Sequence, residues 1–474
     1  MKDLQQVRPT PEQLKLITIP TPGVRVIRGA AGSGKTTTAI LMLRTAIGYL
    51  LDIYRETSGS PAINVKVFSF NRTLKSYISK LVNETSIVKG SQVSELNIEV
   101  TTLSRYLQDR LLSPQKLIHQ ENKKAYIREW GRNINLENDF LIDEVEYVLG
   151  RLPHNNLESY MTMERTGRGN SPRVDSILRR KILDEVIYPY IEYKKNMLLL
   201  DWDDLAERGS HYAMESIDIA IIDEAQDFSA NQLRSIIKQL SPNSFTVIIL
   251  DSAQKIYKRG FTWKDVGISN LTSYRLERNY RNTAQIADFA NKFIENSGIL
   301  FDDDATLSDV KTINKVGCKP KIVQGSFSQQ MDYIIAYIKS NIDLECYSVG
   351  FLHPKGGGWF DYVKSRLLNA GIQFIEISRT NDWPKSDTNV ALSTIHSAKG
   401  LEFDYVFLVG LEDKHFNIDE NDHDNTNYSS TIRLIAMGIT RAKEDVIVSY
   451  SSDREPLFMK LFDKGTYEGH SYVH

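Results

Sequence analysis

The stretch from Gly29 to Thr36 has the residue types and the spacing that suit phosphate binding. It reads Gly-Ala-Ala-Gly-Ser-Gly-Lys-Thr and fits the phosphate-loop pattern G-x-x-x-x-G-K-[ST]. In such a loop, backbone N–H groups and a helix N-terminus hold a polyphosphate. We expect Lys35 to neutralise the β- and γ-phosphates and Thr36 to hold Mg²⁺ through its hydroxyl. The loop therefore predicts binding of a nucleoside triphosphate, with contacts from Gly29, Ala30, Ala31, Gly32, Ser33, Gly34, Lys35, Thr36 and Thr37.

Two adjacent acids suit the hydrolysis of such a nucleotide. Asp223 and Glu224 follow an apolar run at 217–222 that predicts a buried strand. After such a strand, and downstream of a phosphate loop, we expect Asp223 to support Mg²⁺ and Glu224 to orient and deprotonate the attacking water. Gln254 follows the next expected strand, at 245–250, where its amide can touch the γ-phosphate. These residues predict an enzyme that hydrolyses its nucleotide.

Short strands must position these groups. Residues 24–28 read as a strand before the loop, and 37–50 read as a helix after it. Two more β-branched runs lie at 65–70 and 98–103, and helical patterns alternate with the strands. This order is typical of an α/β fold with a parallel sheet covered on both faces. A second α/β unit is expected from about Leu271, with strands at 321–323, 347–351, 374–377, 390–392, 405–408 and 446–448.

Helical patterns dominate from Ser104 to about Ser216, which predicts a helical insertion between two strands of the first sheet. Basic residues collect in this stretch, namely Arg165, Arg168, Arg173, Arg179, Arg180, Lys181, Lys194 and Lys195. They form either a nucleic-acid surface or a solvated face balanced by nearby acids, and the sequence leaves both interpretations open. The acidic, Asn-rich stretch at 413–430 predicts a surface loop.

The composition is that of an ordinary globular protein. The chain has 474 residues, of which 41% are hydrophobic and 25% charged, enough for two or three domains. The formal net charge is −2, so binding to nucleic acid requires local basic surface. Two cysteines, Cys318 and Cys346, argue against a disulfide framework. The N-terminus lacks an apolar signal core and no apolar run approaches a membrane span, so we expect a cytoplasmic protein without membrane contact.

A series of motifs, taken in order, resembles that of the UvrD/Rep-type superfamily 1 DNA helicases. The first half carries PEQ at 11–13, the phosphate loop, FSFN at 68–71, TTL at 101–103, DEAQD at 223–227 and DSAQKIY at 251–257. The second half carries LERNYRN at 276–282, TIHSAKGLEF at 394–403 and AMGITRA at 436–442. The likeness runs from about Thr10 to Tyr450, so it covers nearly the whole chain.

The resemblance implies two RecA-like P-loop domains with parallel sheets, and hydrolysis of ATP with Mg²⁺ at their interface. The first domain would comprise 1–103 and 216–270, interrupted by a helical insertion at 104–215, and the second would comprise 271–474. Because each domain would supply part of the site, hydrolysis would be coupled to closure of the cleft between them.

The resemblance also implies roles for individual residues. Arg281 and Arg441 would act as arginine fingers on the γ-phosphate. Tyr280 would stack on the adenine, Glu402 would meet the ribose, and both Lys399 and Gly400 would line the same cleft. Gln13 could read the adenine edge with its amide, although its position also suits a solvated residue at a helix start.

In the family, single-stranded DNA crosses both domains and its bases stack on aromatic side chains. Phe70, Asn71, Thr102 and His396 fall at matching positions, although His396 also suits a satisfied core histidine. The family's base-stacking aromatic residue is displaced in this chain, and Phe261 or Trp263 could take its place. The implied activity is ATP-driven movement along single-stranded DNA in the 3′ to 5′ direction.

The chain departs from the family pattern in the second domain. Full-length helicases carry a long accessory insertion after the strand that corresponds to 374–377, whereas only residues 378–389 separate that strand from the next here. We therefore expect movement on single strands with weak unwinding of long duplexes. Two other functions stay open: a regulatory DNA-sensing ATPase that controls a protein partner, such as the nuclease of an antiviral defence pair, and a motor that acts on RNA.

Overall fold

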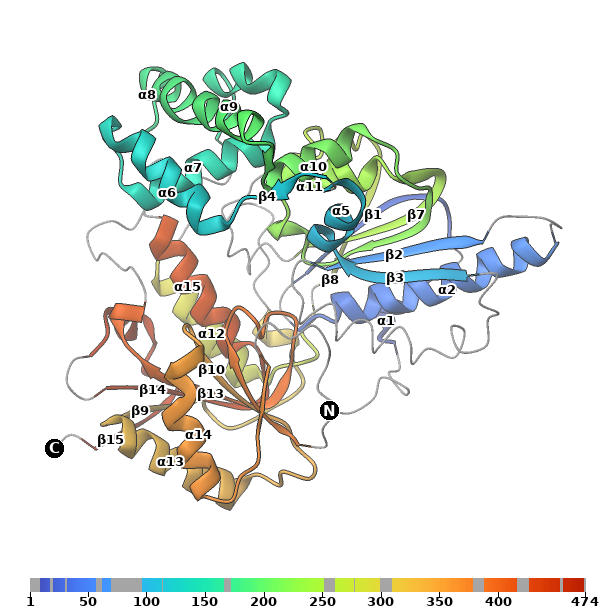
Figure 1. Cartoon of the computed structure of the whole chain (residues 1–474). Coiled ribbons are helices and arrows are strands. Elements are labelled where there is room, and N and C mark those ends of the chain that lie inside the picture. The colour runs from blue at the N-terminus through green and yellow to red at the C-terminus, as the bar shows by residue number, and fades with distance from the viewer. Residues whose placement is uncertain are drawn as a thin grey trace.

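The computed structural model shows two α/β units and a helical insertion that lies beside the first unit and above the second (Figure 1). It describes residues 9–17, 20–29, 32–56, 62–69, 96–112, 114–165, 172–250, 261–276, 278–298, 309–377, 388–415, 426–451 and 455–472. Five predicted site residues lie outside this part of the chain, namely Ala30, Ala31, Phe70, Asn71 and Gln254.

The first unit is built on a six-stranded sheet in the order β3-β2-β6-β7-β1-β8. Its strands, all paired in parallel, are β1 (Gly23–Gly29), β2 (Ile63–Ser69), β3 (Leu96–Thr102), β6 (Ile217–Ile222), β7 (Leu240–Leu250) and β8 (Leu271–Leu276). Helix α2 (Lys35–Glu56) packs on one face. The other face is covered by α5 (Leu103–Leu111), α10 (Trp202–His211) and α11 (Ala230–Ile237). The prediction of a parallel sheet covered on both faces is confirmed.

One predicted boundary is wrong. We expected the second unit to begin near Leu271, but β8 pairs with β1 at the edge of the first sheet, with Leu271 opposite Val24 and Leu276 opposite Gly29. The chain therefore leaves the first unit only after Leu276. Strand β8 also places the segment that follows it, with Tyr280 and Arg281, beside the phosphate loop at the end of β1.

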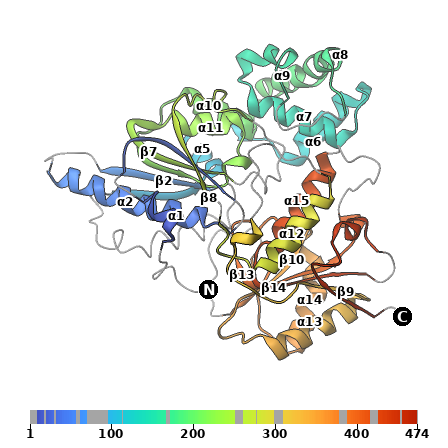
Figure 2. The same cartoon turned by 180° about the vertical axis from the view of Figure 1, so that it is seen from behind.

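The helical insertion has a hydrophobic core of its own. Its helices are α6 (Gln120–Trp130), α7 (Asn138–Arg151), α8 (Ser176–Lys181) and α9 (Tyr188–Asn196), and a π-helical stretch at Ile182–Ile187 joins the last two. The pair β4 (Lys116–Leu117) and β5 (Leu199–Leu200) lies where the chain enters and leaves this body. Figure 2 shows from behind that the insertion lies above the second unit and beside the first.

The insertion is smaller than the predicted range of 104–215. Helices α5 and α10 lie inside that range, but Tyr106, Leu107 and Leu205 join the core beneath the first sheet. The sequence showed helical periodicity without showing which core each helix faces, so the prediction assigned both helices to the insertion.

Most described members of the basic cluster are bound by groups of the insertion or of α10. Arg165 pairs with buried Glu144 at 2.7 Å, Arg180 pairs with Glu158 at 2.7 Å and Lys194 pairs with Asp204 at 2.7 Å. Arg179 donates to backbone carbonyls at 2.7 and 2.8 Å. These contacts favour the interpretation in which nearby acids balance the cluster.

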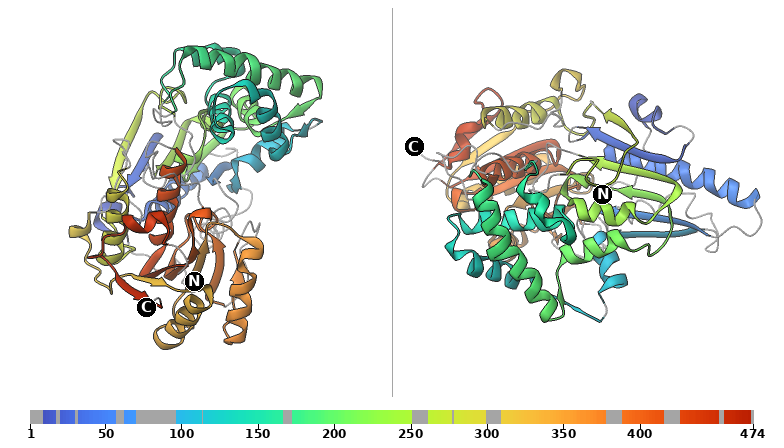
Figure 3. Two further views of the ribbon diagram at one scale, coloured as in Figure 1. Left: turned by 90° about the vertical axis from the view of Figure 1, so that its left-hand side faces the viewer. Right: turned by 90° about the horizontal axis from the view of Figure 1, so that it is seen from above.

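The second unit contains a seven-stranded sheet in the order β11-β12-β10-β13-β14-β9-β15. The strands are β9 (Lys321–Gln324), β10 (Val349–His353), β11 (Ile375–Glu376), β12 (Val390–Thr394), β13 (Phe403–Leu411), β14 (Ala442–Tyr450) and β15 (Glu468–Ser471). Helices α12 (Ala284–Asn296) and α15 (Thr426–Ile439) cover one face, and α13 (Phe327–Asn341) and α14 (Asp361–Asn369) cover the other (Figure 3). The predicted strands are all present, and the short, exposed edge strand β15 was not predicted.

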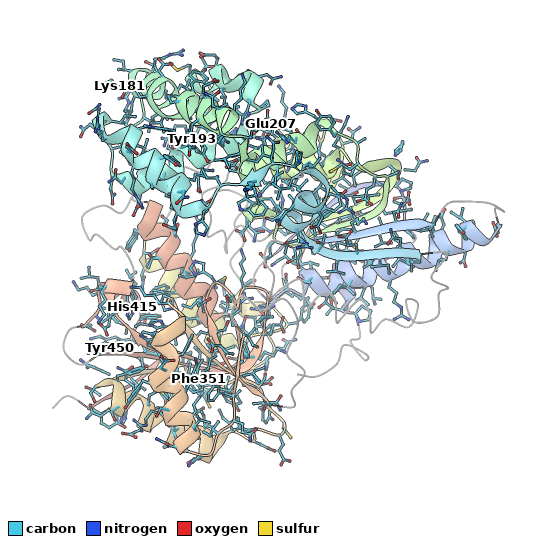
Figure 4. The ribbon with its side chains drawn as sticks, viewed as in Figure 1. Lys181, Tyr193, Glu207, Phe351, His415 and Tyr450 are labelled. Carbon is cyan, nitrogen blue, oxygen red and sulfur yellow. The ribbon has the colours of Figure 1, made fainter. Side chains whose placement is uncertain are left out.

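Side chains fill both units and the insertion, as Figure 4 shows with Phe351 and Tyr450 in the second unit and Tyr193 in the insertion. Short 3₁₀ helices lie at Gly131–Asn133, His154–Met161, Ala225–Asp227, Val310–Thr312, Gly357–Phe360, Asp413–His415 and Leu457–Leu461. The first element of the described chain is α1 (Pro11–Leu14).

Helix α2 is long and apolar enough to cross a membrane by length and composition, with a mean hydropathy of 1.2 over Lys35–Tyr54. The expectation that no run approaches a membrane span therefore needs correction. The apolar character has another cause here, because Ala39, Leu43 and Ile47 pack against the first sheet as part of its core.

Candidate nucleotide site

The phosphate loop joins the end of β1 to the start of α2. Gly32 and Gly34 have φ angles of +79° and +77°, in the left-handed region that favours glycine. A Cβ on Gly34 would also lie 2.6 Å from the side-chain amide nitrogen of Gln13. Lys35 Nζ donates to the carbonyl of Gly29 at 2.8 Å, so its ammonium group reaches back across the loop. The described part of the loop therefore offers left-handed glycines and a nearby cation, two features that suit a polyphosphate site.

Gln13 lies against this loop rather than in solvent. It is buried, and its Nε2 donates to the carbonyl of Gly34 at 3.3 Å. Its Oε1 accepts from the backbone of Thr10 at 2.9 Å and closes a capping box on α1. Gln13 does lie at a helix start, but the interpretation of a solvated residue is wrong, and the contact with the adenine edge stays a prediction.

Thr36 and Asp223 meet at the carboxyl end of the first sheet. Thr36 Oγ1 donates to Asp223 Oδ2 at 3.0 Å. A hydroxyl and a carboxylate are hard oxygen donors of the kind that Mg²⁺ prefers, so these two residues fit the predicted cation. Burial, and then the neighbouring charge of Glu224, raise the pKa of Asp223. A bound cation would favour the ionised carboxylate.

Glu224 is buried and has a strained backbone. Its φ of +54° lies in the left-handed region, which non-glycine residues enter mostly at functional sites. Its carboxylate accepts from the Gln226 amide and lies 3.3 Å from Lys399 Nζ. Burial alone would raise the pKa of Glu224, but the charges of Lys399, Lys35 and Arg441 outweigh it and lower the pKa. Glu224 is therefore held as a carboxylate, the form that a general base requires.

Lys399 connects the two units. It lies in the loop between β12 and β13 and is 3% exposed, and its Nζ reaches Asp227 Oδ2 of the first unit at 2.5 Å. Gly400 follows it with a φ of +81°, a backbone conformation that turns the chain toward β13. The predicted placement of Lys399 and Gly400 in the cleft agrees with these positions.

The segment with Tyr280 and Arg281 lies over the phosphate loop. The Tyr280 N–H donates to the carbonyl of Gly32 at 3.0 Å, and its side chain is 43% exposed, which leaves a face for an adenine ring. The Arg281 guanidinium donates to Glu402. Burial would raise the pKa of Glu402, but Arg281 and Lys443 together lower it to about 2.

Arg441 is buried between the predicted motifs of the second unit. Its Nε donates to the carbonyl of Met437 at 3.1 Å and its Nη1 to that of Leu401 at 3.3 Å. Asn282 ties the Arg281 segment to the same place by donating to the carbonyl of Thr440 at 3.1 Å. The charge of Arg441 also lowers the pKa of Glu224.

The predicted DNA-contacting residues that the structure describes differ in their exposure to solvent and in their contacts. The Thr102 hydroxyl accepts from the Arg105 N–H and caps α5. The ring centroids of Trp263 and Phe261 lie 5.5 Å apart, and both side chains pack against the core of the first unit. His396 is exposed, unlike a core histidine. Exposure thus favours His396 as a surface contact, whereas Trp263 is partly engaged in packing.

Two residues of this site received no role from the sequence. Asp227 holds Lys399, and Lys443 Nζ lies 3.2 Å from Glu402. Asp227 lies in the DEAQD motif and Lys443 directly follows AMGITRA. Their position in or next to a motif was therefore the sequence feature that could have indicated a place in this site.

Comparisons with known proteins find similarity to DNA helicases. Residues 364–453 match the UvrD-like helicase C-terminal domain. A probable DNA helicase from Mycoplasma pneumoniae is 23% identical and covers 93% of this chain and 84% of its own length. A probable DNA helicase II homolog from Mycoplasma capricolum is 24% identical over 74% of this chain and 49% of its own length. The ATP-dependent DNA helicase Rep of Buchnera aphidicola is 35% identical, over 20% of this chain and 14% of its own length.

Proposed function

We propose that this chain, a member of the UvrD/Rep-type superfamily 1 helicases, hydrolyses ATP between its two α/β units and uses the energy to move along single-stranded DNA. The names of its relatives, which are DNA helicases, support DNA as the substrate. The proposed direction of movement, 3′ to 5′, follows from the family resemblance.

One observation carries the proposal: groups from both units converge on the phosphate loop. Thr36 and Asp223 of the first unit meet at 3.0 Å, and Lys399 of the second lies 2.5 Å from Asp227 and 3.3 Å from Glu224. Phosphoryl transfer requires positioning and electrostatic stabilisation more than covalent chemistry, and this cleft concentrates cations around a carboxylate.

The residues divide the work of hydrolysis. Lys35 and the loop would hold the phosphates, Thr36 and Asp223 would hold Mg²⁺, and Glu224 would accept a proton from the attacking water. Mg²⁺ would neutralise charge on the phosphates. The guanidinium groups of Arg281 and Arg441 belong to the second unit, so they would stabilise the γ-phosphoryl only while the units are closed together.

The experiment that tests the proposal compares steady-state ATPase rates without nucleic acid, with single-stranded DNA, with duplex DNA and with RNA. We expect single-stranded DNA to stimulate hydrolysis most, and we expect its binding to weaken with salt because phosphate contacts release counterions. A rate that only RNA or duplex stimulates would contradict the proposed substrate, and an absence of ATPase activity under all four conditions would contradict the motor.

A further inference from the structure

The Arg281 guanidinium is turned toward Glu402. Arg281 Nη2 donates to Glu402 Oε1, although the two residues are 121 positions apart. The backbone beside Arg281 is fixed on the phosphate loop by the bond from Tyr280 N–H to Gly32 O at 3.0 Å. The backbone of Arg281 therefore lies beside the phosphate loop, while its guanidinium is bound to Glu402. Glu402 is the carboxylate that the family resemblance assigns to the ribose.

This conformation leaves one donor of Arg281 unsatisfied. The side chain is 13% exposed, and its Nε is buried without a hydrogen-bond acceptor among the described residues. A buried unsatisfied donor costs about 1–3 kcal/mol. A second position that offers more acceptors, such as the oxygens of a γ-phosphate, would remove that cost.

Glu402 can release Arg281 without becoming an isolated charge. Its Oε2 lies 3.2 Å from Lys443 Nζ, which is attached to a different segment of the second unit. A carboxylate that lost all its partners would be strongly unfavourable in this setting. With Lys443 in place, a single hydroxyl donor would suffice to replace the hydrogen bond from Arg281.

We propose that Arg281 and the nucleotide sugar exchange partners on Glu402, so that a ribose hydroxyl decides whether Arg281 is free to reach the γ-phosphate. The inference rests on the proposed function and adds to it a determinant of sugar specificity. In this exchange the hydrogen-bond partner of Arg281 changes from the Glu402 carboxylate to the γ-phosphate. The partner of Glu402 changes from the Arg281 guanidinium to the ribose hydroxyl. A nucleotide without that hydroxyl binds, but it leaves Arg281 on Glu402.

The exchange predicts that ATP and its deoxy analogues differ in kcat more than in KM. An interaction that only the transition state realises changes kcat, whereas uniform binding changes KM. We therefore expect that either 2′-deoxy-ATP or 3′-deoxy-ATP lowers kcat about 10- to 100-fold relative to ATP, the range set by one hydrogen bond to a charged group. The change in KM is expected to be smaller.

Two variants separate the exchange from a simple loss of contact. In Glu402→Gln the neutral amide no longer retains the guanidinium, so the ratio of kcat between ATP and the deoxy analogue should approach one. In Lys443→Ala the pair of Arg281 with Glu402 remains, so the preference for the ribose should persist. Equal kcat values for ATP and both analogues on the parent protein would overturn the proposal, and so would an unchanged preference in Glu402→Gln. The parent measurement decides the question even if a variant fails to fold.

A binding measurement keeps the inference separate from the ATPase proposal. Arg281 should contribute to the affinity for ADP with beryllium fluoride, a γ-phosphate mimic, but not to the affinity for ADP. The gain in affinity from the fluoride should therefore be about 10-fold or more larger with ADP than with the matching deoxy-ADP, and the two gains should be equal in Glu402→Gln. A protein that hydrolyses no ATP would contradict the proposed function, whereas equal gains in the parent would contradict the exchange.

Discussion

Lys399 Nζ of the second unit lies 2.5 Å from Asp227 Oδ2 and 3.3 Å from Glu224 Oε2 of the first. These ion pairs connect the loop after β12 to the acidic residues that follow β6. Lys399 is 3% exposed and Asp227 is fully buried, so solvent screens the interaction little. This single ammonium group thus joins the two units and also keeps the proposed catalytic base ionised.

The first prediction follows from that double role. Lys399→Met should raise the pKa of Glu224, because the charge of Lys399 is the strongest influence that lowers it. A general base works above its pKa, so the acid limb of the pH–kcat profile should move to higher pH. The variant should also be about 3–5 kcal/mol less stable, because Asp227 loses a buried partner.

A second substitution distinguishes the two effects. Adding Asp227→Asn to Lys399→Met should restore most of the stability, because the fully buried charge of Asp227 is removed together with its partner, but the shifted pH profile should remain. Lys414→Ala serves as the control, since Lys414 is 70% exposed and pairs only with nearby Glu412 among the described contacts. A parent-like pH profile in Lys399→Met would show that Lys399 does not tune the base.

The second prediction concerns Glu224 itself. Glu224→Gln should bind ATP like the parent and hydrolyse it at least roughly 10²-fold more slowly, the scale expected for a positioned base. Steady-state ATPase assays would measure the rate of hydrolysis, and binding of a fluorescent ADP analogue would measure nucleotide affinity. Glu412→Gln, at an acid on the surface beside Lys414, should hydrolyse ATP normally. Near-parent turnover in Glu224→Gln would exclude Glu224 as the base.

The third prediction separates the two arginines. Either Arg281→Ala or Arg441→Ala should lower kcat on the order of 10³-fold with a smaller effect on nucleotide affinity. Arg441 is 2% exposed and donates to two backbone carbonyls, so its loss should also lower the unfolding temperature, whereas Arg281→Ala should not. Arg278→Ala is the matched control, because its side chain is 55% exposed. Normal hydrolysis in both alanine variants would mean that the interunit site is misplaced.

The local parts of the site could be read from the sequence because they are set by neighbouring residues. The phosphate loop, the strand at 217–222 and the acids after it depend on a few consecutive positions, and the structure has the described parts of these elements where they were expected. The two α/β units followed from the alternation of apolar runs and helical patterns for the same reason.

Long-range pairing could not be read in this way. The sequence gives Leu271–Leu276 the pattern of a strand, but only the folded sheet shows that its partner is β1. The contact of Lys399 with Asp227 spans 172 positions, and that of Arg165 with Glu144 depends on how the insertion folds. A charged residue has the same local signature whether it faces solvent or an acid from a distant segment, which is why the basic cluster had two interpretations.

The fourth prediction concerns unwinding. Strands β11 and β12 are neighbours in the second sheet, and residues 378–389 are too few to form a domain with its own core. The purified chain should therefore move along single strands but displace long duplexes poorly. A strand-displacement assay on tailed substrates with short and long duplexes would measure this, with Glu224→Gln as the inactive control. Processive unwinding of the long duplex would contradict the inference.

The last prediction concerns the junction between the insertion and the first unit, where His154 Nδ1 lies 2.9 Å from Glu207 Oε2 of α10. Burial would lower the pKa of His154, but Glu207, with Asp204 behind it, outweighs burial and the opposing charge of Lys194 and raises it above 6.5. A raised pKa means that the stabilisation is fully present below about pH 6.5 and is lost as the pH rises through the folded-state value. His154→Gln should therefore destabilise the protein by about 1 kcal/mol near pH 6 and by less near pH 9, as measured by urea unfolding. His211→Gln, whose 53% exposed ring lies 3.9 Å from the same carboxylate, should change little at either pH. A destabilisation of His154→Gln that is equal at the two pH values would show that the ion pair does not fasten this junction.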